Sequence, residues 1–477
     1  MEVLVSNPPW PGPGYGARSD VRWPHRRSDK YLEYPVYLAY AVAVLEKSGV
    51  DVGFIDGVAE DLSTQTFVDA VKKIGPNIIV MECSTPSIDH DLLTAKRLKE
   101  ELKDVFITFV GSHPTYFHKE ILTENSFVDA IARGEFDYTI RDLSLALLKG
   151  SALKGVKGIS YRDNERVHIN ENRPLIQDLD ALPFPARHIV KSDCYREAVF
   201  TGKECTTMVS SRGCPYSCVF CLWPGTMYGR RFRSRSAENV VDEVEQVVDK
   251  HGVEEIYFDD DCFTLNRKRA MKICEGIRKR GVDVKWMIQA RVDNVDQEYL
   301  EEMKKAGCHY IKYGVESGSQ EMLDQMKKRI KLDDVRRAFA LTKKLGIKTQ
   351  AFFLFGLPWE THETIRKSIE FAKELNPDSV QFAVVVPQPG TELYDICLEK
   401  GWLKFDSWED FDCRKALIET ENLSARDVEG YRRQAYREYY FRPSYILRTT
   451  LKMWNPKEAR RILKSAKSVI ERISYYK

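Results

Sequence analysis

The sequence predicts an α/β protein with an N-terminal doubly wound parallel sheet, a central partial (β/α)6 barrel and a C-terminal helical segment. Short runs rich in β-branched residues alternate with helical patterns over residues 1–150 and again over residues 205–400, and this spacing is typical of parallel βαβ units. Residues 151–204 lose the alternation and are expected to form a linker with one hairpin. From residue 401 to residue 477 only helical patterns remain.

Composition narrows the class of protein. A length of 477 residues allows two to four domains at about 100–200 residues each, and 43% hydrophobic with 30% charged residues is typical of a globular chain. No apolar run approaches the roughly 18 residues of a spanning helix, and the first residues lack the pattern of a secretion signal. The eleven cysteines are mostly scattered, which favours a reducing compartment. We therefore expect a cytoplasmic protein.

The strands of the first domain follow from its hydrophobic pattern, and they are expected at residues 2–6, 51–56, 77–84 and 104–112, with helices between them. In such a sheet, ligands bind beyond the carboxyl ends of the strands. The loops at these ends are rich in Gly, Pro and small hydroxyl residues, and the candidates for ligand contact are Pro8, Asp56, Ser84, Thr85, Gly111, Ser112 and His113. Ordinary turns favour the same residue types, so the pattern alone leaves their role open.

Six strands are expected in the second repeat of the alternation, at residues 206–213, 255–261, 284–291, 310–317, 349–358 and 379–390. Helical patterns follow the first five strands, at residues 236–252, 266–281, 297–307, 332–346 and 362–375. A complete barrel of this type has eight units. Six units therefore predict an open, three-quarter barrel.

The C-terminal helical segment is strongly basic. From residue 426 to residue 477 there are 14 Lys and Arg against 5 Asp and Glu, a net charge of +9 within a whole chain of +2. Aromatic and aliphatic residues alternate with these cations at roughly helical spacing. Such a segment can lie on an anionic membrane surface, or it can pack its apolar face on the barrel as a helical cap, and the sequence leaves both interpretations open.

One group of cysteines differs from the others. Cys214, Cys218 and Cys221 follow the first barrel strand in a C-x3-C-x2-C arrangement. Thiolates at this spacing can converge on one iron–sulfur cluster. A closed zinc site needs four ligands, and no nearby Cys or His completes such a set. Three thiolates leave one iron open to a small molecule, whereas the other eight cysteines are expected to be buried or incidental.

This cysteine spacing on the first strand of a partial barrel resembles the radical SAM superfamily, and the resemblance covers residues 205–395. It implies that the open iron of a [4Fe-4S] cluster chelates S-adenosylmethionine (SAM). One electron, from a donor such as ferredoxin or flavodoxin, would then release a 5′-deoxyadenosyl radical that abstracts a substrate hydrogen. The cofactors carry the chemistry, and the protein orients and shields them.

The same resemblance nominates SAM-binding residues at the ends of the barrel strands: Phe220, Asp260, Asp261, Gln289, Arg291, Glu316, Ser317, Gly356 and Pro358. The acids belong to a run that begins at Asp259. Three adjacent carboxylates are too costly to bury without partners, so they favour either a cationic ligand or solvent. Arg291 could equally form an ordinary surface ion pair.

The N-terminal domain is similar to the cobalamin-binding domain that precedes the barrel in a large radical SAM subclass. The loop candidates Pro8, Ser84, Thr85, Gly111 and Ser112 match the positions around the corrin and the nucleotide tail. The family's DxHxxG pattern is incomplete, because Asp56 is followed by Gly57 but by no His. The resemblance therefore implies either cobalamin as a third cofactor, bound without an axial His from this loop, or a domain that has lost it, and His113 is expected to be a loop or tail contact.

Longer phrases resemble a narrower group. STPS, IARGEFDYTI, LPFPARH and YFRPSYILR look like the hopanoid-associated enzymes that contract a ribosyl ring to a cyclitol, and like archaeal calditol synthase. The implied reaction is ring contraction of a sugar or polyol headgroup on a lipid, with the basic segment 426–477 at the membrane surface.

Two alternatives stay open. The first is cobalamin-dependent C-methylation or oxidative ring formation on a lipid or tetrapyrrole. The second is RNA or protein modification, for which a second cysteine cluster and an RNA-binding β-domain are missing, so a nucleic-acid partner is not expected.

Overall fold

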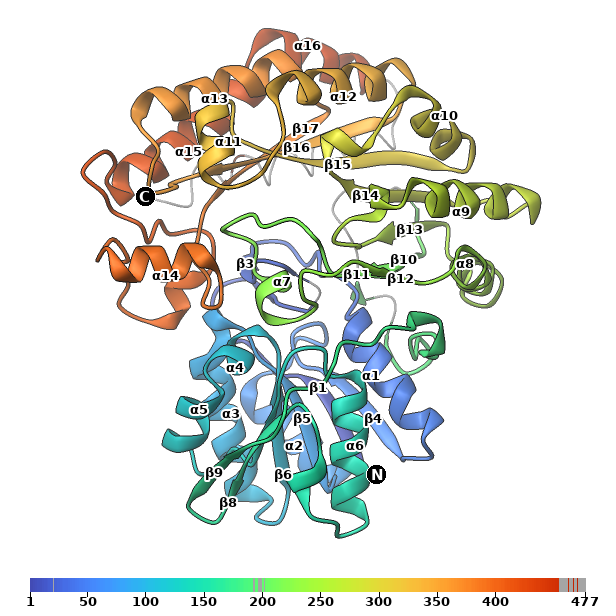
Figure 1. Cartoon of the computed structure of the whole chain (residues 1–477), viewed down its shortest axis with the longest axis vertical. Helices are drawn as coiled ribbons and strands as arrows, with labels where there is room; N and C mark the ends of the chain where they lie inside the picture. Colours follow the sequence, from blue (N-terminus) through green and yellow to red (C-terminus); the bar gives the residue numbers. More distant parts are fainter. Residues whose placement is uncertain are drawn as a thin grey trace.

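Two sheets follow one another along the chain (Figure 1). The computed structural model describes residues 1–19, 21–191, 194–195, 200 and 202–453, together with 462, 466 and 470. The first sheet has the strand order β4-β1-β5-β6-β7-β8-β9, in which the first five strands are parallel and the last two pair antiparallel. Its strands are β1 (Val3–Asn7), β4 (Val52–Asp56), β5 (Ile78–Glu82), β6 (Phe106–Val110), β7 (Ala130–Ala132), β8 (Ile159–Asp163) and β9 (Arg166–Ile169).

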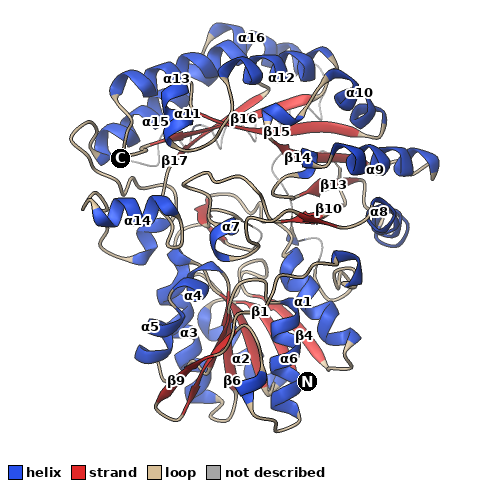
Figure 2. Cartoon of the chain, viewed as in Figure 1, coloured by secondary structure: helices blue, strands red, loops and turns tan. Residues whose placement is uncertain are grey.

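Helices cover both faces of this sheet (Figure 2). They are α1 (Val36–Lys47), α2 (Thr64–Ile74), α3 (Ile88–Glu101), α4 (Ser112–Tyr116), α5 (His118–Glu124) and α6 (Asp137–Leu148). Helix α1 packs beside α6, and α2 packs beside α3, each pair over its own hydrophobic core. The prediction of a doubly wound sheet is confirmed. The predicted linker begins at residue 151, yet its hairpin, β8 and β9, continues the sheet to Ile169, so the sheet crosses the predicted boundary.

The second sheet is the expected partial barrel, with six parallel strands in the order β10-β13-β14-β15-β16-β17. They are β10 (Cys205–Met208), β13 (Glu255–Phe258), β14 (Lys285–Ala290), β15 (Cys308–Glu316), β16 (Lys348–Phe355) and β17 (Ser379–Val384). The helices after these strands are α8 (Ala237–His251), α9 (Arg267–Lys279), α10 (Gln297–Lys305), α11 (Gln320–Gln325), α12 (Leu332–Lys344), α13 (His362–Leu375) and α14 (Glu392–Glu399).

Helix α8 illustrates why the sequence pattern forms these elements. The Ser236 side chain caps its first turn by accepting a hydrogen bond from the Asn239 amide, and Gly252 ends it in the left-handed conformation at φ 63°. Val240, Val244 and Val247 recur at helical spacing and are buried against the barrel.

Helix α15 (Ala425–Tyr440) closes the free edge of β17 with its side chains. The Tyr440 hydroxyl accepts a hydrogen bond from the Val380 amide and donates one to the Val380 carbonyl, both at 2.9 Å. Tyr436 accepts from the Phe382 amide at 3.2 Å, and Arg432 donates to the Phe382 carbonyl at 3.0 Å. An uncovered edge strand invites pairing with another chain. This part of the basic segment is therefore a structural cap of the barrel.

Helix α16 (Pro443–Lys452) follows and exposes Ile446, Leu447 and Leu451. The rest of the predicted basic segment, including Trp454, lies outside the described residues except for 462, 466 and 470. In the part of the chain that the structure describes, no helix combines the length and the apolarity needed to cross a membrane.

A segment between β1 and α1 was not predicted as a structural feature. Residues 8–34, here called the N-terminal insert, form the small hairpin of β2 (Tyr15–Ala17) and β3 (His25–Arg27). The insert leaves the first sheet and reaches the interior of the barrel, because Arg22 and Trp23 line the barrel cavity. It therefore belongs to both halves of the molecule.

Buried ion pairs join the two halves. Arg212, in the short strand β11 (Ser211–Arg212), pairs with Glu135 at 2.8 Å and with Asp137 at 2.7 Å, and Arg233, in β12 (Arg233–Ser234), pairs with Glu135 at 2.7 Å. All four side chains are at most 4% exposed. Buried ion pairs are costly to break when one partner is removed. This network fixes the first sheet against the start of the barrel.

Candidate active site

The loop between β11 and β12 carries the three cysteines of the predicted cluster site. Gly213 opens the loop at φ +81°, and a Cβ atom there would lie 2.5 Å from the Arg231 carbonyl oxygen, so the two ends of the loop approach too closely for a side chain. Cys214, Cys218 and Cys221 all line one cavity. Among the described residues, no three His, Cys, Asp or Glu side chains converge on a point that a single metal ion could occupy.

The three thiols have different surroundings. Burial raises the pKa of Cys218 and of Cys221, whereas a hydrogen bond with the Cys262 thiol lowers the pKa of Cys214 to about 7. Cys262 was expected to be incidental. It lies directly after the acidic run at the end of β13 and contacts the cluster loop, which its sequence position alone could not indicate.

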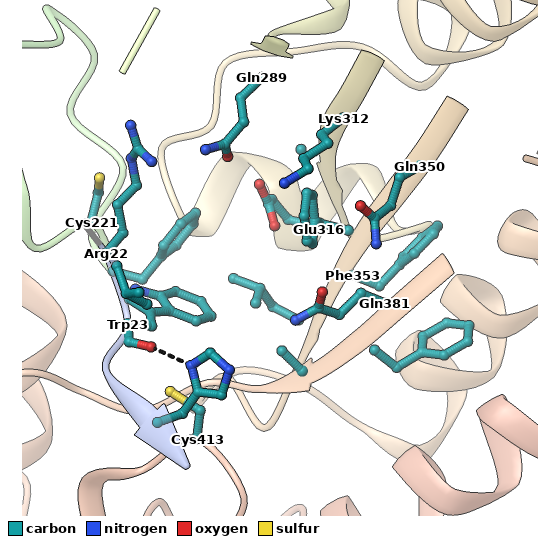
Figure 3. Close-up of a pocket in the computed structure, with 18 of the residues that line it drawn as sticks. Arg22, Trp23, Cys221, Gln289, Lys312, Glu316, Gln350, Phe353, Gln381 and Cys413 are labelled. Atoms are coloured by element: carbon teal, nitrogen blue, oxygen red, sulfur yellow. Dashed lines mark hydrogen bonds between the residues drawn. The ribbon is translucent and has the colours of Figure 1, made fainter. Parts of the chain in front are cut away.

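The cavity lies inside the barrel and has a volume of about 440 Å³. The inner faces of β14 to β17, the cysteine loop, the N-terminal insert and residues 412–414 form its walls (Figure 3). Trp23 of the insert packs edge-to-face on Phe220 at 5.8 Å between ring centroids. Phe220, nominated as a SAM-binding residue, lines the cavity together with the three cysteines.

The three adjacent acids point in different directions. Asp259 and Asp261 line the cavity, whereas Asp260 does not. The Asp260 carboxylate accepts hydrogen bonds from the amide and hydroxyl of Ser210 and from the hydroxyl of Ser211, which fixes the end of β10. Burial raises the pKa of Asp260 and of Asp261. Asp260, nominated as a SAM contact, therefore fixes the residues that follow β10, whereas Asp259 faces the cavity.

Arg22 of the insert lies between the two cavity acids. Its guanidinium pairs with Asp259 at 2.7 Å and with Asp261 at 3.2 Å, and it stacks over the Trp223 ring at 4.4 Å. Asp261 also accepts a hydrogen bond from the Gly213 amide at 3.1 Å. A cation from the first 30 residues therefore sits beside the cysteine loop. Its partners are 237 and 239 positions away, and no local pattern marks such a contact.

Of the other nominated SAM-binding residues, some line the cavity and some are buried elsewhere in the barrel. Gln289, Arg291 and Glu316 line the cavity. Arg291 stacks over Tyr216 at 3.6 Å, and Glu316 pairs with Lys328 at 2.7 Å.

Besides Asp260, three further nominated residues do not line the cavity: Ser317, Gly356 and Pro358. The Ser317 hydroxyl is fully buried against Ser368 of α13. Gly356 and Pro358 belong to the loop after β16, which Glu360 holds by accepting hydrogen bonds from the Gly356 and Leu357 amides at 2.6 and 3.1 Å. Burial raises the pKa of Glu360 to about 8.

The nominated cobalamin contacts gather at the carboxyl edge of the first sheet, which faces the barrel. Helix α4, which contains Ser112 and His113, contacts α7 (Trp223–Thr226), and the turn η1 (Thr85–Ser87) contacts η7 (Trp408–Phe411). Gly111 has φ +115°, and a Cβ atom there would lie 2.2 Å from the Cys83 carbonyl oxygen. Small residues therefore let the two loops pack closely at this edge.

Two nominated residues, Asp56 and His113, already have partners within the protein. The Asp56 carboxylate accepts hydrogen bonds from Asn7, Tyr195 and the amides of Val58 and Ala59. The His113 ring is enclosed by Phe117 and Trp408, and burial lowers its pKa to about 3, so the imidazole is neutral.

The switch point of the sheet, between β1 and β5, contains residues of the insert. Arg18 pairs with Asp91 at 2.6 Å with both side chains fully buried, and it donates hydrogen bonds to the carbonyls of Pro8 and Glu82. The Ser19 hydroxyl donates to the Glu82 carboxyl group, whose pKa burial raises to about 7. Ligands of doubly wound sheets bind at this position. The insert therefore forms the floor of the region where a ligand of this domain would lie.

The comparisons with known proteins agree with both halves of this arrangement. The chain matches the radical SAM superfamily over residues 208–372 and the B12 binding domain over residues 26–144. An uncharacterized methyltransferase of Pyrococcus horikoshii is 33% identical over 414 residues, which cover 87% of this chain and 89% of that protein.

Two further relatives are more distant. The anaerobic magnesium-protoporphyrin IX monomethyl ester cyclase of Rubrivivax gelatinosus is 28% identical, covering 94% of this chain and 78% of the cyclase. The hopanoid C-3 methylase of Methylococcus capsulatus is 26% identical, covering 81% and 72%. The solved structure of the cobalamin-dependent SAM radical enzyme OxsB, with aqua-cobalamin and SAM bound, superposes with a TM-score of 0.72 at 19% identity and covers 99% of this chain and 71% of OxsB.

The chain belongs to the radical SAM superfamily, in the group whose barrel follows an N-terminal B12-binding domain. It is a radical SAM enzyme. The predicted cofactors, a [4Fe-4S] cluster and SAM for the barrel and cobalamin for the first domain, are confirmed at the level of these families.

The residues present fit these cofactors. Asp259 Oδ2 is buried in the cavity and has no hydrogen-bond partner among the described residues, so it can accept a bond from a cationic group such as the SAM ammonium. The three cysteines would hold the cluster, and Asp259, Asp261 and Arg291 would surround the methionine end of SAM. The edge formed by Ser84, Thr85, Gly111 and Ser112 would contact cobalamin.

Proposed function

We propose that the protein is a cobalamin-dependent radical SAM methyltransferase that transfers a methyl group to a carbon atom of a small or lipid-linked substrate. The observation that carries this proposal is the buried network of Arg212 with Glu135 and Asp137. Arg212 is two residues before Cys214, so the network holds the cysteine loop against the B12-binding domain. A reaction that uses both cofactors on one substrate requires this fixed arrangement, whereas ring contraction after hydrogen abstraction requires only the barrel cofactors.

Several relatives support methyl transfer over the ring contraction suggested by the sequence. The relative with 33% identity is named a methyltransferase, and the hopanoid relative is a methylase. Oxidative ring formation is the second candidate, because the magnesium-protoporphyrin cyclase aligns over 94% of this chain.

When bound, the cofactors supply reductive cleavage of SAM and a transferable methyl group. The chain's own residues position and shield them. Asp259 and Asp261 provide negative charge beside the cysteine loop, and Trp23 with Phe220 forms an apolar wall against water. The insert closes the open side of the barrel.

The test is product analysis with SAM that carries a deuterated methyl group. Reconstituted enzyme, cobalamin, a reductant and an extract of cells lacking the gene are combined without oxygen. Methyl transfer predicts S-adenosylhomocysteine and 5′-deoxyadenosine together, with a product that gains a trideuteromethyl group. Cys218→Ala should abolish both nucleoside products, and Cys194→Ala is the matched control that should not.

Each alternative gives a different pattern. Ring contraction gives 5′-deoxyadenosine without S-adenosylhomocysteine and a product with no mass gain from SAM. Oxidative ring formation gives 5′-deoxyadenosine with a product that has lost hydrogen. Either pattern would replace the methyltransferase proposal.

We also propose two partners. A ferredoxin or flavodoxin would reduce the cluster, because the cysteine loop reaches the surface at Pro215. An anionic lipid surface would contact α16, whose exposed Leu447 and Leu451 lie one helical turn apart. The second partner suits a lipid-linked substrate.

A further inference from the structure

Three polar side chains stand on the cavity wall formed by β15, β16 and β17. They are Lys312, Gln350 and Gln381, one from each strand, and all three line the cavity (Figure 3). Lys312 lies directly opposite Gln350 in the parallel pairing, and Gln381 lies opposite Phe352, two residues further along β16. The three side chains therefore form one patch across adjacent strands, here called the polar patch.

The two side-chain amides of this patch have no partner among the described residues. Gln350 and Gln381 pair through their backbones in the sheet, but their side chains make no hydrogen bond with any described residue. Gln289, the neighbour of Lys312 on the other side, instead donates to Tyr257 and to Asp259. Both side chains are part-buried and line the cavity, so a ligand in the cavity can provide hydrogen-bond partners for them.

The charge around the patch favours an anion. Eight Lys and Arg side chains line the cavity against six Asp and Glu. Each of the six carboxylates already has a cationic partner: Asp29 and Glu33 pair with Arg27, Asp259 and Asp261 with Arg22, Glu316 with Lys328, and Asp412 with Arg414. The Lys312 ammonium lies 4.1 Å from the centroid of the Tyr257 ring, on the wall of the cavity.

Two of the three patch residues lie across the cavity from the cysteine loop. Gln350 and Gln381 stand on the side opposite Cys221, whereas Lys312 is paired with Gln289, which donates to Asp259 (Figure 3). Phe352 and Leu354 of β16 and Ala383 of β17 line the cavity near the patch and are apolar. A ligand held at the patch would therefore extend an apolar body toward the cofactors.

We propose that Lys312, Gln350 and Gln381 bind an oxyanion, a carboxylate or a phosphate, on the substrate that receives the methyl group. The substrate is then an amphipathic acid whose charged end is held at the patch and whose apolar body reaches the reacting end of the cavity. That the bound anion belongs to the methyl acceptor rests on the proposed function. That the patch binds an anion does not.

The experiment measures binding without turnover. The holoenzyme, with its cluster and cobalamin, is titrated calorimetrically with octanoate, octyl phosphate and the neutral octanamide. At least one anion should bind, at least about tenfold more tightly than octanamide, a difference of about 1.4 kcal/mol. Lys312→Met should abolish this preference and leave octanamide binding unchanged, and Lys312→Arg should retain it.

Control variants distinguish loss of the anion site from misfolding of the protein. Lys343→Met, at an exposed position on α12, should leave all three affinities unchanged. Gln350→Leu and Gln381→Leu should each weaken anion binding severalfold. Cluster absorbance and thermal unfolding of each variant show whether it has folded.

The outcomes distinguish the sources of the anion and the two proposals. Binding of octanoate alone assigns a carboxylic acid, and binding of octyl phosphate alone assigns a phosphate ester. Equal binding of octanamide, no binding of any probe, or full anion binding by Lys312→Met overturns the inference. If the enzyme transfers a methyl group but shows no preference for anions, the proposed function holds and the anion site is wrong. If it binds anions but transfers no methyl group, the anion site holds and the proposed function is wrong.

Discussion

Residues that are adjacent in this sequence can have different structural roles. Asp259 and Asp261 face the cavity, while Asp260 between them holds the serines at the end of β10. Glu316 likewise lines the cavity, whereas the next residue, Ser317, is bonded to Ser368 outside it. A motif can place such residues at the end of a strand, but side-chain direction there depends on the local backbone, and Glu316 itself has φ +69° next to an irregular register.

Glu360 gives a prediction at this scale. Its raised pKa means that the folded state retains a proton that the unfolded chain releases. The resulting stability is fully present below about pH 4.5 and is lost as pH rises toward 8. Glu360→Gln removes the titration, so its free energy of unfolding should rise relative to wild type by about 2 to 4 kcal/mol between pH 5 and pH 9. Thermal and urea unfolding across this range would measure the difference.

The control for this prediction is Glu363→Gln, an exposed position on the adjacent helix α13. It should leave the pH dependence unchanged. A difference between wild type and Glu360→Gln that stays constant from pH 5 to pH 9 would contradict the assignment of the titration to Glu360.

At the scale of elements, the sequence predicted most of the barrel. Each of its six strands begins within two residues of its predicted start, because alternating strand and helix patterns are local signals, whereas β10 and β17 end five and six residues before their predicted ends. The N-terminal insert was missed because its hairpin has strands of three residues and its partners lie far along the chain. The polar patch was missed because Gln350 and Gln381 interrupt strands that otherwise look like ordinary buried strands.

The cap formed by α15 gives a second prediction. Tyr436→Phe with Tyr440→Phe removes the hydroxyls that bond to Val380 and Phe382 but keeps the rings. Each backbone group left without a partner should cost about 1–3 kcal/mol of stability, measured by urea unfolding. Light scattering should also show concentration-dependent association through the exposed edge of β17.

Tyr431→Phe is the control for the cap, because its hydroxyl contacts His362 and not a strand. It should neither lower stability comparably nor cause association. A double variant as stable and as monodisperse as Tyr431→Phe would show that the hydroxyls do not protect the edge.

Helix α16 gives a third prediction. Leu447→Ser with Leu451→Ser should reduce flotation with vesicles of anionic lipid, because both side chains are more than 60% exposed and would enter the interface. Thr450→Ser, on the same face, is the control. Equal flotation of the double variant and wild type would argue against a lipid contact at this helix.

At the scale of the whole molecule, the ion network of Arg212 joins the two halves. Arg212→Met would leave Glu135 and Asp137 partly unpaired in a buried interface. The expected loss is about 3–5 kcal/mol of stability, and the two halves should unfold in transitions that are further apart than in the wild type. Urea unfolding followed by tryptophan fluorescence and by far-ultraviolet circular dichroism would detect the separation.

Lys72→Met is the matched control, since Lys72 pairs with Glu101 at 2.6 Å on the exposed surface. It should cause no measurable change, because exposed pairs are screened by water. One cooperative transition in Arg212→Met, at wild-type stability, would mean that other contacts join the halves.

The position of Arg22 also constrains the order of events at the ribosome. Arg22 leaves the ribosome early, but its partner Asp259 is synthesised 237 residues later. At about 5–20 residues per second, this delay is roughly 10 to 50 s. During that time the B12-binding domain can form while its insert has no barrel to enter. Arg22 and Trp23, although translated early, are thus among the last residues to reach their native contacts, and completion of the catalytic chamber comes late in folding.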